Sequence, residues 1–255
     1  MIRSGFVFLV VAFLTTIYGL RILRRARKGA ADTECLCERL ARRWSRAILR
    51  MSGVQVRVVG AERISDDEPF VVASNHQSWF DVFALVAHFP GRARFVAKQE
   101  LEGIPIFGRA WRVCGHISID RSDRNRAIAS LQEAGGRIWD EDKVIIMFPE
   151  GTRSRDGGLK PFKKGAFILA IQAGVPILPV AVVGSRAVMP KGSWRIRPGE
   201  IEIRVGTPIP VAGLAHDDRD RLRVEAWRAV AALKGDGEEL QISERPPDGP
   251  VGDPT

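Results

Sequence analysis

A histidine and an aspartate five positions apart are the residues of this sequence best suited to acid–base chemistry. His76 and Asp81 lie in the segment NHQSWFD (75–81), which follows an apolar run ending at Ser74 and precedes an apolar helical pattern. Five positions on a regular helix separate two side chains by about 140°, so contact requires His76 in the turn and Asp81 in the first helical turn. The carboxylate would then orient the imidazole, whose second nitrogen could accept a proton from a hydroxyl. For the spacing alone, a capping aspartate beside an ordinary loop histidine is the commoner arrangement.

A second group of residues could bind an anion. The segment FPEGTRSR (148–155) ends another apolar run, and glycines and lysines follow it between positions 157 and 165. A glycine-containing turn rich in cations can hold a phosphate through backbone amides and through the planar guanidinium of Arg153. Such a charge run is more often an exposed, solvated loop. Glu150 inside the run favours a binding role, because it could orient an arginine.

Two further segments carry little chemistry by themselves. GHISIDR (115–121) ends in an Asp–Arg pair, and an isolated surface ion pair contributes only about 0 to 1 kcal/mol. VPILPV (175–180) has the pattern of a buried strand with proline near its start. Neither segment indicates a reaction when it is considered alone.

Short β-like runs alternate with helical patterns after residue 53. The alternation predicts the α/β class, with one domain over residues 53–234 built on a mostly mixed sheet flanked by helices. Residues 235–255 are rich in Gly, Pro and acidic residues and are predicted to form a disordered tail. The strand-like runs are 54–59, 70–74, 94–98, 116–119, 144–148, 177–183 and 201–205, and the helical patterns lie near 82–90, 124–139, 164–173 and 222–233.

Residues 1–52 predict a membrane-associated helical region. Residues 5–20 carry no charge, and a cluster of basic residues follows them. Because a spanning helix needs about 20 apolar residues, this segment either spans with its flanking arginines at the interface or enters one leaflet. Residues 33–51 have the pattern of a basic amphipathic helix, which could pack on the core but is expected to lie on an anionic membrane surface. The basic excess places the catalytic domain on the cytoplasmic face of the cell membrane.

Composition narrows the class of partner. The chain of 255 residues has 39 Lys and Arg against 30 Asp and Glu, a formal charge of +9 that favours anionic partners. Nucleic acid is not expected, because no recognisable binding module is present. The cysteines, Cys35, Cys37 and Cys114, lack a second Cys/His pair at zinc-finger spacing. They are therefore predicted to be reduced and structural, and no metal site is expected.

In this order, the four segments resemble the motif blocks of the glycerolipid acyltransferase family, and in particular of the 1-acylglycerol-3-phosphate acyltransferases. The similarity includes residues 98–108 and covers roughly residues 54–210. It implies that His76 is the general base and that Asp81 orients it. It also implies that Glu150, Gly151 and Arg153, together with Arg121, bind the acceptor's phosphate. The family often has Phe where this chain has Ser118, so the resemblance leaves the acyl or acceptor preference open but not the class of reaction. The candidate substrate-binding residues are Glu150, Gly151, Thr152, Arg153, Arg121 and Lys163.

The resemblance implies transfer of a fatty acyl group from acyl-CoA or acyl carrier protein to the 2-hydroxyl of 1-acylglycerol 3-phosphate. The product would be phosphatidic acid, and no cofactor would be needed because a thioester is already activated. Other acceptors remain open: glycerol 3-phosphate, a lyso-ornithine lipid or another lysophospholipid. A lipase-type hydrolase is disfavoured because the Gly-x-Ser-x-Gly pattern is absent. A catalytically silent adaptor that binds anionic membranes is the alternative outside the enzyme class.

Overall fold

The computed structural model describes residues 2–30, 32–65, 68–89, 92–120 and 143–235. Three sequence predictions lie outside these residues: the role of Arg121, the helix near 124–139, and the disordered tail from residue 236 onward.

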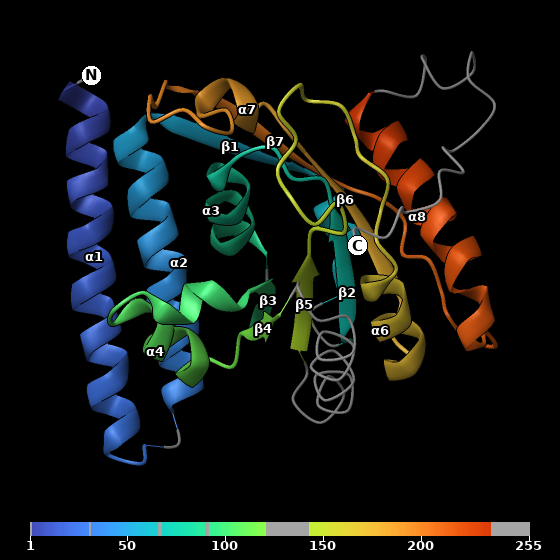
Figure 1. Ribbon diagram of the computed structural model, residues 1–255, viewed down its shortest axis with the longest axis horizontal. Coiled ribbons are helices and arrows are strands. Elements are labelled where there is room, and N and C mark those ends of the chain that lie inside the picture. Colours follow the sequence, from blue (N-terminus) through green and yellow to red (C-terminus); the bar gives the residue numbers. More distant parts are fainter. Residues whose placement is uncertain (1, 31, 66–67, 90–91, 121–142, 236–255) are drawn as a thin grey trace, which may run out of the picture.

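A seven-stranded sheet forms the centre of the described structure (Figure 1). Every neighbouring pair of strands is parallel except β6 and β7, which are antiparallel, so the predicted mixed sheet is confirmed. The strands are β1 (Val54–Val59), β2 (Phe70–Ser74), β3 (Arg92–Lys98), β4 (Ile117–Ile119), β5 (Lys143–Met147), β6 (Ile177–Val183) and β7 (Gly199–Val205), in the spatial order β1-β7-β6-β2-β5-β3-β4.

Helices cover both faces of the sheet (Figure 1). The α-helices are α1 (Ile2–Arg27), α2 (Thr33–Ser52), α3 (Trp79–His88), α4 (Phe107–Val113), α6 (Gly165–Ala173), α7 (Ser185–Val188) and α8 (Arg219–Lys234), with 3-10 turns η1 (Ala61–Arg63), η2 (Gln99–Gly103) and η3 (His216–Asp218). The predicted helices in the described part of the chain are confirmed. α4 and α7 were not predicted, because they are too short to show a helical period.

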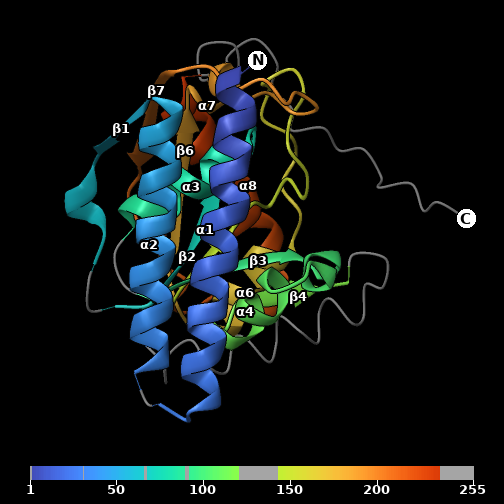
Figure 2. The same cartoon turned by 90° about the vertical axis from the view of Figure 1, so that its left-hand side faces the viewer.

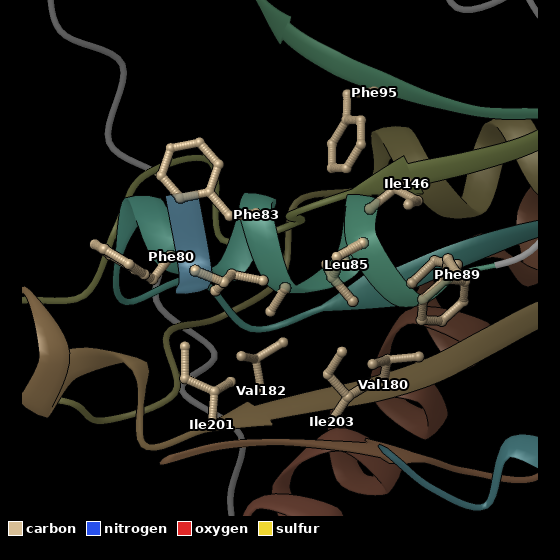
Figure 3. Close-up of a cluster of buried hydrophobic side chains, with 14 of the residues drawn as sticks. Phe80, Phe83, Leu85, Phe89, Phe95, Ile146, Val180, Val182, Ile201 and Ile203 are labelled. Atoms are coloured by element: carbon tan, nitrogen blue, oxygen red, sulfur yellow. The ribbon is translucent and has the colours of Figure 1, made fainter. Parts of the chain in front are cut away.

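The alternation of side chains along β2 creates two separate cores. Val72 faces the cluster that α2 and α3 cover, whereas Val71 and Ala73 face the cluster beneath α6 and α8. On the first face, Figure 3 shows the side chains of α3 above those of β6 and β7, with Leu85 above Val180. Full burial of one such side chain contributes about 1.5 to 3 kcal/mol. The site-bearing loops therefore stand on strands that are packed from both sides.

α1 and α2 form a pair of helices along one side of the domain (Figure 2). The apolar face of α2 is buried, with Ile48 fully inside the core cluster. This differs from the expectation that α2 would present that face to a membrane, because α1 and α3 already cover it. The exposed apolar surface belongs instead to α1, whose length and composition would allow it to cross a membrane. This surface, here called the α1 apolar face, consists of Phe6, Leu9, Phe13, Ile17 and Leu20.

The prediction that all three cysteines are reduced is wrong. Cys37 on α2 and Cys114 at the end of α4 form a disulfide, with their Cα atoms 5.6 Å apart, while Cys35 is free and exposed. The two cysteines are 77 residues apart in sequence. Their proximity arises from the packing of α4 against the helical pair, which local spacing does not encode.

Three chain segments that could carry chemistry meet at one edge of the sheet. β2 lies between β5 and β6 and runs parallel to both, so the carboxyl ends of these strands share an edge. The segments are the β2–α3 turn (75–78), the β5–α6 loop (148–164) and the β6–β7 connection (184–198). Ligands of open α/β sheets bind at this kind of edge.

Candidate active site

His76 and Asp81 are in direct contact. Nδ1 of His76 lies 2.7 Å from Oδ2 of Asp81, which accepts the hydrogen bond as a carboxylate. His76 lies in the β2–α3 turn and Asp81 in the first turn of α3, which is the arrangement that the spacing required. The imidazole is 16% exposed. Within the described residues, no protein hydrogen bond to its Nε2 atom is recorded, so that nitrogen can meet a substrate hydroxyl.

Asp81 orients His76 and also caps α3, so the two interpretations of its role are compatible. Its Oδ2 atom accepts from the backbone N–H groups of Gln77 at 2.7 Å and Ser78 at 2.8 Å. Ser78 completes a capping box by accepting from the N–H of Phe80. The Asp81 side chain is fully buried. A carboxylate bound by amides in this way has little freedom to turn away from the imidazole.

Asn75 fixes the start of the turn to the neighbouring strand. Its side-chain amide donates to the carbonyl of Val182 at 2.9 Å and its side-chain oxygen accepts from the Val182 N–H at 2.7 Å. The pair of bonds continues the pairing of β2 with β6 for one position beyond Ser74. These bonds therefore fix the position of the backbone just before His76.

Glu150 joins the β5–α6 loop to the turn that carries His76. Its carboxylate accepts from the N–H of His76 at 2.6 Å and from the N–H of Lys160 at 3.2 Å. The side chain is 4% exposed, and burial raises the pKa of Glu150 to about 7, with a smaller contribution from the nearby Asp81 charge. Among the described residues its hydrogen bonds come from two backbone amides, so Glu150 connects the two loops and is not seen to orient an arginine. Its role in binding the acceptor's phosphate stays a prediction.

Arg153 lies on the same loop and contacts Trp79, the first residue of α3. Its guanidinium carbon lies 5.0 Å from the ring centre of Trp79, over the ring face. Burial lowers the pKa of Arg153, and the charge of Asp81 opposes this effect. A cation–π contact of this kind contributes about 0.5 to 2 kcal/mol. Phe148 stacks on the imidazole of His76 with ring centres 4.0 Å apart, which limits the rotation of the imidazole.

Three other predicted substrate-binding residues, Gly151, Thr152 and Lys163, belong to the same β5–α6 loop. Gly151 has φ of +73°, a backbone conformation that favours glycine. A Cβ atom there would lie 2.9 Å from the flexible side chain of Lys163, which could move aside. Lys163 is exposed, and its N–H donates to the carbonyl of Pro149. The Thr152 hydroxyl accepts from the ammonium of Lys191 at 2.9 Å.

Around β4, Ser118 connects the strand to Trp111 on α4. The Ser118 hydroxyl accepts from the indole N–H of Trp111 at 3.1 Å. The Trp111 ring in turn stacks on His116, with ring centres 4.1 Å apart. A Phe at position 118 would remove this hydrogen bond. Arg121 follows directly, outside the described residues. Among the described residues, no group of three or more His, Cys, Asp or Glu side chains is placed to hold a metal ion.

Sequence reasoning missed several residues that shape the site. Trp79 and Phe148 lie inside the recognised segments, and a Trp only three positions after His76 was a signal that could have been used. Gln77, also in the turn, donates to the carbonyl of Gly157 at 2.9 Å. Lys191 lies in a connection with no recognisable pattern, and only the tertiary structure places it beside Thr152.

The mixed sheet with a histidine–aspartate pair and a cationic loop at one edge defines an acyltransferase domain, and residues 55–183 match the Acyltransferase family. The chain therefore belongs to that family and is an enzyme of this class. It is 36% identical over 189 residues to the human 1-acyl-sn-glycerol-3-phosphate acyltransferase alpha, covering 72% of this chain and 67% of the human enzyme. The 1-acyl-sn-glycerol-3-phosphate acyltransferase of Limnanthes douglasii is 38% identical over 64% of this chain and 57% of its own length.

A solved structure agrees with the fold. The crystal structure of the 1-acyl-sn-glycerophosphate (LPA) acyltransferase PlsC from Thermotoga maritima superposes with a TM-score of 0.74 and 28% sequence identity. The match covers 96% of this chain and 99% of the Thermotoga chain, so it includes the N-terminal helices as well as the sheet.

Proposed function

We propose that this enzyme transfers a fatty acyl group from a thioester to the 2-hydroxyl of 1-acylglycerol 3-phosphate, giving phosphatidic acid. The observation that carries the proposal is the contact of His76 with Asp81 beside the guanidinium of Arg153. A base and a phosphate-binding cation at one site suit an acceptor that carries a hydroxyl and a phosphate. The names of the relatives support the same acceptor.

In the proposed mechanism, His76 is the general base. Its Nε2 atom takes the proton from the acceptor hydroxyl while the oxygen attacks the thioester carbonyl. The tetrahedral intermediate then collapses, the carbon–sulfur bond breaks, and the imidazolium returns the proton to the leaving thiolate. Asp81 stabilises the imidazolium and holds the tautomer that leaves Nε2 free. General base catalysis of this kind contributes roughly 10²- to 10⁴-fold.

The oxyanion needs donors other than the first amides of the turn. The N–H of His76 donates to Glu150, and those of Gln77 and Ser78 donate to Asp81. These three amides organise the base and are already occupied. We therefore assign oxyanion stabilisation to other donors at the site.

The reaction as proposed requires no metal or cofactor. A thioester is already activated toward an alcohol, so the chain has to supply only a base, a site for the acceptor and a site for the donor. Acyl-CoA and acyl carrier protein both deliver such a thioester, and both are retained as donors.

We further propose that the enzyme works at the cytoplasmic face of the cell membrane, on anionic lipid surfaces. The α1 apolar face is exposed over several turns, with exposed fractions from 42% at Ile17 to 71% at Leu9. Basic residues lie at both ends of α1, with Arg3 near its start and a group in its last turn. Apolar residues flanked by cations suit a helix inserted between lipid chains and anionic head groups.

A thiol-release assay over an acceptor panel tests the proposed function. The full chain in mixed micelles is given acyl-CoA, or acylated carrier protein, with lysophosphatidic acid, glycerol 3-phosphate, a lyso-ornithine lipid or lysophosphatidylcholine. The highest kcat/KM is expected with lysophosphatidic acid. A higher value with another acceptor would replace the acceptor, whereas no thiol release with any acceptor would favour the silent adaptor.

A further inference from the structure

Three side chains from outside the β5–α6 loop bind alternate carbonyl groups within it. Lys191 donates to the carbonyl of Arg153 at 3.0 Å, Arg186 donates to that of Arg155 at 3.1 Å, and Gln77 donates to that of Gly157 at 2.9 Å. Peptide groups held at every second residue fix the direction of the chain between them. The backbone conformation around Arg153 is therefore fixed by side chains that lie outside the loop.

The same stretch is also bound to the turn that carries the base. The N–H of Ser154 donates to the carbonyl of His76 at 2.7 Å. Lys191 makes a second contact, since its ammonium also donates to the Thr152 hydroxyl at 2.9 Å. Lys191 thus binds the residues on both sides of the peptide bond between Thr152 and Arg153. A small shift there would move the guanidinium relative to His76.

Several other positively charged side chains lie near the Lys191 ammonium. Partial burial of its ammonium lowers the pKa of Lys191, and the positive charges of Lys160, Arg155 and Arg153 lower it further. Like charges at one place oppose each other. An anionic ligand would relieve this repulsion, so the arrangement favours a site that is completed by a phosphate.

We propose that Lys191 and Arg186 are positioning residues for the acceptor's phosphate. They fix the backbone of the β5–α6 loop so that the guanidinium of Arg153 stays over the ring of Trp79, at the start of the helix that carries Asp81. The Lys191 ammonium adds positive charge to the same loop. Both residues lie beyond the segment 55–183 that matches the Acyltransferase family. This inference rests on the proposed function, because it takes lysophosphatidic acid as the acceptor.

Kinetics of two Lys191 variants test the proposal. Lys191→Met removes the hydrogen bonds and the charge but keeps the length of the side chain, whereas Lys191→Arg keeps both donors and charge. For the full chain in mixed micelles with acyl-CoA, Lys191→Met should raise KM for lysophosphatidic acid about three- to tenfold, with kcat within about twofold. Lys191→Arg should restore KM to within about twofold of wild type. Arg186→Met, which loses one carbonyl contact, should raise KM in the same direction by less.

Controls separate this proposal from a general effect on folding or on the membrane. Arg195→Met removes an exposed cation from the same connection and should leave KM unchanged. Hydrogen–deuterium exchange of the peptide 151–158 should become faster in Lys191→Met and stay at the wild-type rate in Arg195→Met. An unchanged KM in both Lys191→Met and Arg186→Met, or an equal KM increase in Arg195→Met, would overturn the proposal. A wild type that does not use lysophosphatidic acid would instead refute the proposed function, and the exchange result would still report on the contacts.

Discussion

The carboxylate of Glu150 accepts a hydrogen bond of 2.6 Å from the backbone N–H of His76, across 74 positions of sequence. The residue proposed as base and the loop that carries the proposed phosphate-binding arginine are therefore directly joined. A second hydrogen bond joins the same two segments, because the N–H of Ser154 donates to the carbonyl of His76 at 2.7 Å. A substitution in one segment should consequently change the position of the other.

His76→Ala should lower the rate constant by roughly 10²- to 10⁴-fold, the usual contribution of a general base. The protein should stay folded, because the imidazole makes its main contacts with Phe148 and Asp81 at the surface of the site. Turnover is measured with acyl-CoA and lysophosphatidic acid, and folding by circular dichroism. Wild-type turnover in a folded His76→Ala protein would remove the central element of the mechanism.

Asp81→Ala should lower turnover to a similar extent and also destabilise the protein, because Asp81 accepts two backbone hydrogen bonds in addition to the imidazole. Ser78→Ala is the control, since it leaves the dyad but removes a cap at the same helix start and the hydrogen bond from the Ser78 hydroxyl to the Met189 carbonyl. It should cost about 1 kcal/mol of stability with kcat nearly unchanged. Denaturant unfolding and kcat are compared for both variants. Equal losses of kcat would show that capping alone matters.

Stability should depend on pH through Glu150. Below about pH 4.5 this carboxyl is neutral in both states, and between about 4.5 and about 7 the folded protein keeps a proton that the unfolded chain has lost. Its contribution to stability therefore falls as pH rises through this window and levels off above about 7, by about 3 kcal/mol in all. Glu150→Gln cannot ionise and should lack this dependence. Unfolding of both proteins is followed from pH 5 to 8.5, and a constant difference between them would contradict the assignment.

Arg153→Lys should reduce kcat/KM for lysophosphatidic acid by roughly tenfold to a hundredfold although the charge is kept. A guanidinium can grip a phosphate monoester with two charge-assisted hydrogen bonds, each contributing about 1.5 to 3 kcal/mol, and an ammonium cannot reproduce this geometry. The loss should appear mainly in KM and should shrink with lysophosphatidylcholine. Trp79→Leu, which removes the ring beneath Arg153, should cause a smaller loss in the same direction. An equal loss with both acceptors would reject the phosphate assignment.

Replacing Leu9 and Phe13 by Gln should release the protein from anionic vesicles. These side chains are 71% and 62% exposed, so the change removes apolar surface without opening the core. Each lost apolar side chain should weaken binding by about 1.5 to 3 kcal/mol, or at least tenfold. Val59→Gln, at an exposed apolar position on β1, is the control and should pellet with vesicles as the wild type does. Truncation of residues 1–50 would be a poorer test, because Ile48 and Leu49 belong to the main core.

Local sequence patterns determined the strands and the longer helices of this protein and pointed to His76 as the proposed base. Strands such as β6 are continuous apolar runs, and the period of α2 is clear in Leu36, Leu40 and Ile48, because burial of a strand or helix face requires these patterns. The dyad was also predictable, since a turn followed by a helix start brings His76 and Asp81 together over five positions. The prediction of α/β class followed from the alternation of these patterns.

The tertiary structure alone decided what surrounds the dyad. Glu150, Lys191 and the disulfide between Cys37 and Cys114 depend on contacts between residues 39 to 77 positions apart. Such contacts follow from the order of strands in the sheet and from how helices pack on it, and neither is encoded in local spacing. For the same reason the exposed apolar surface of the N-terminal region proved to be on α1. The apolar face of α2 was already used by its neighbours, and only their packing could show it.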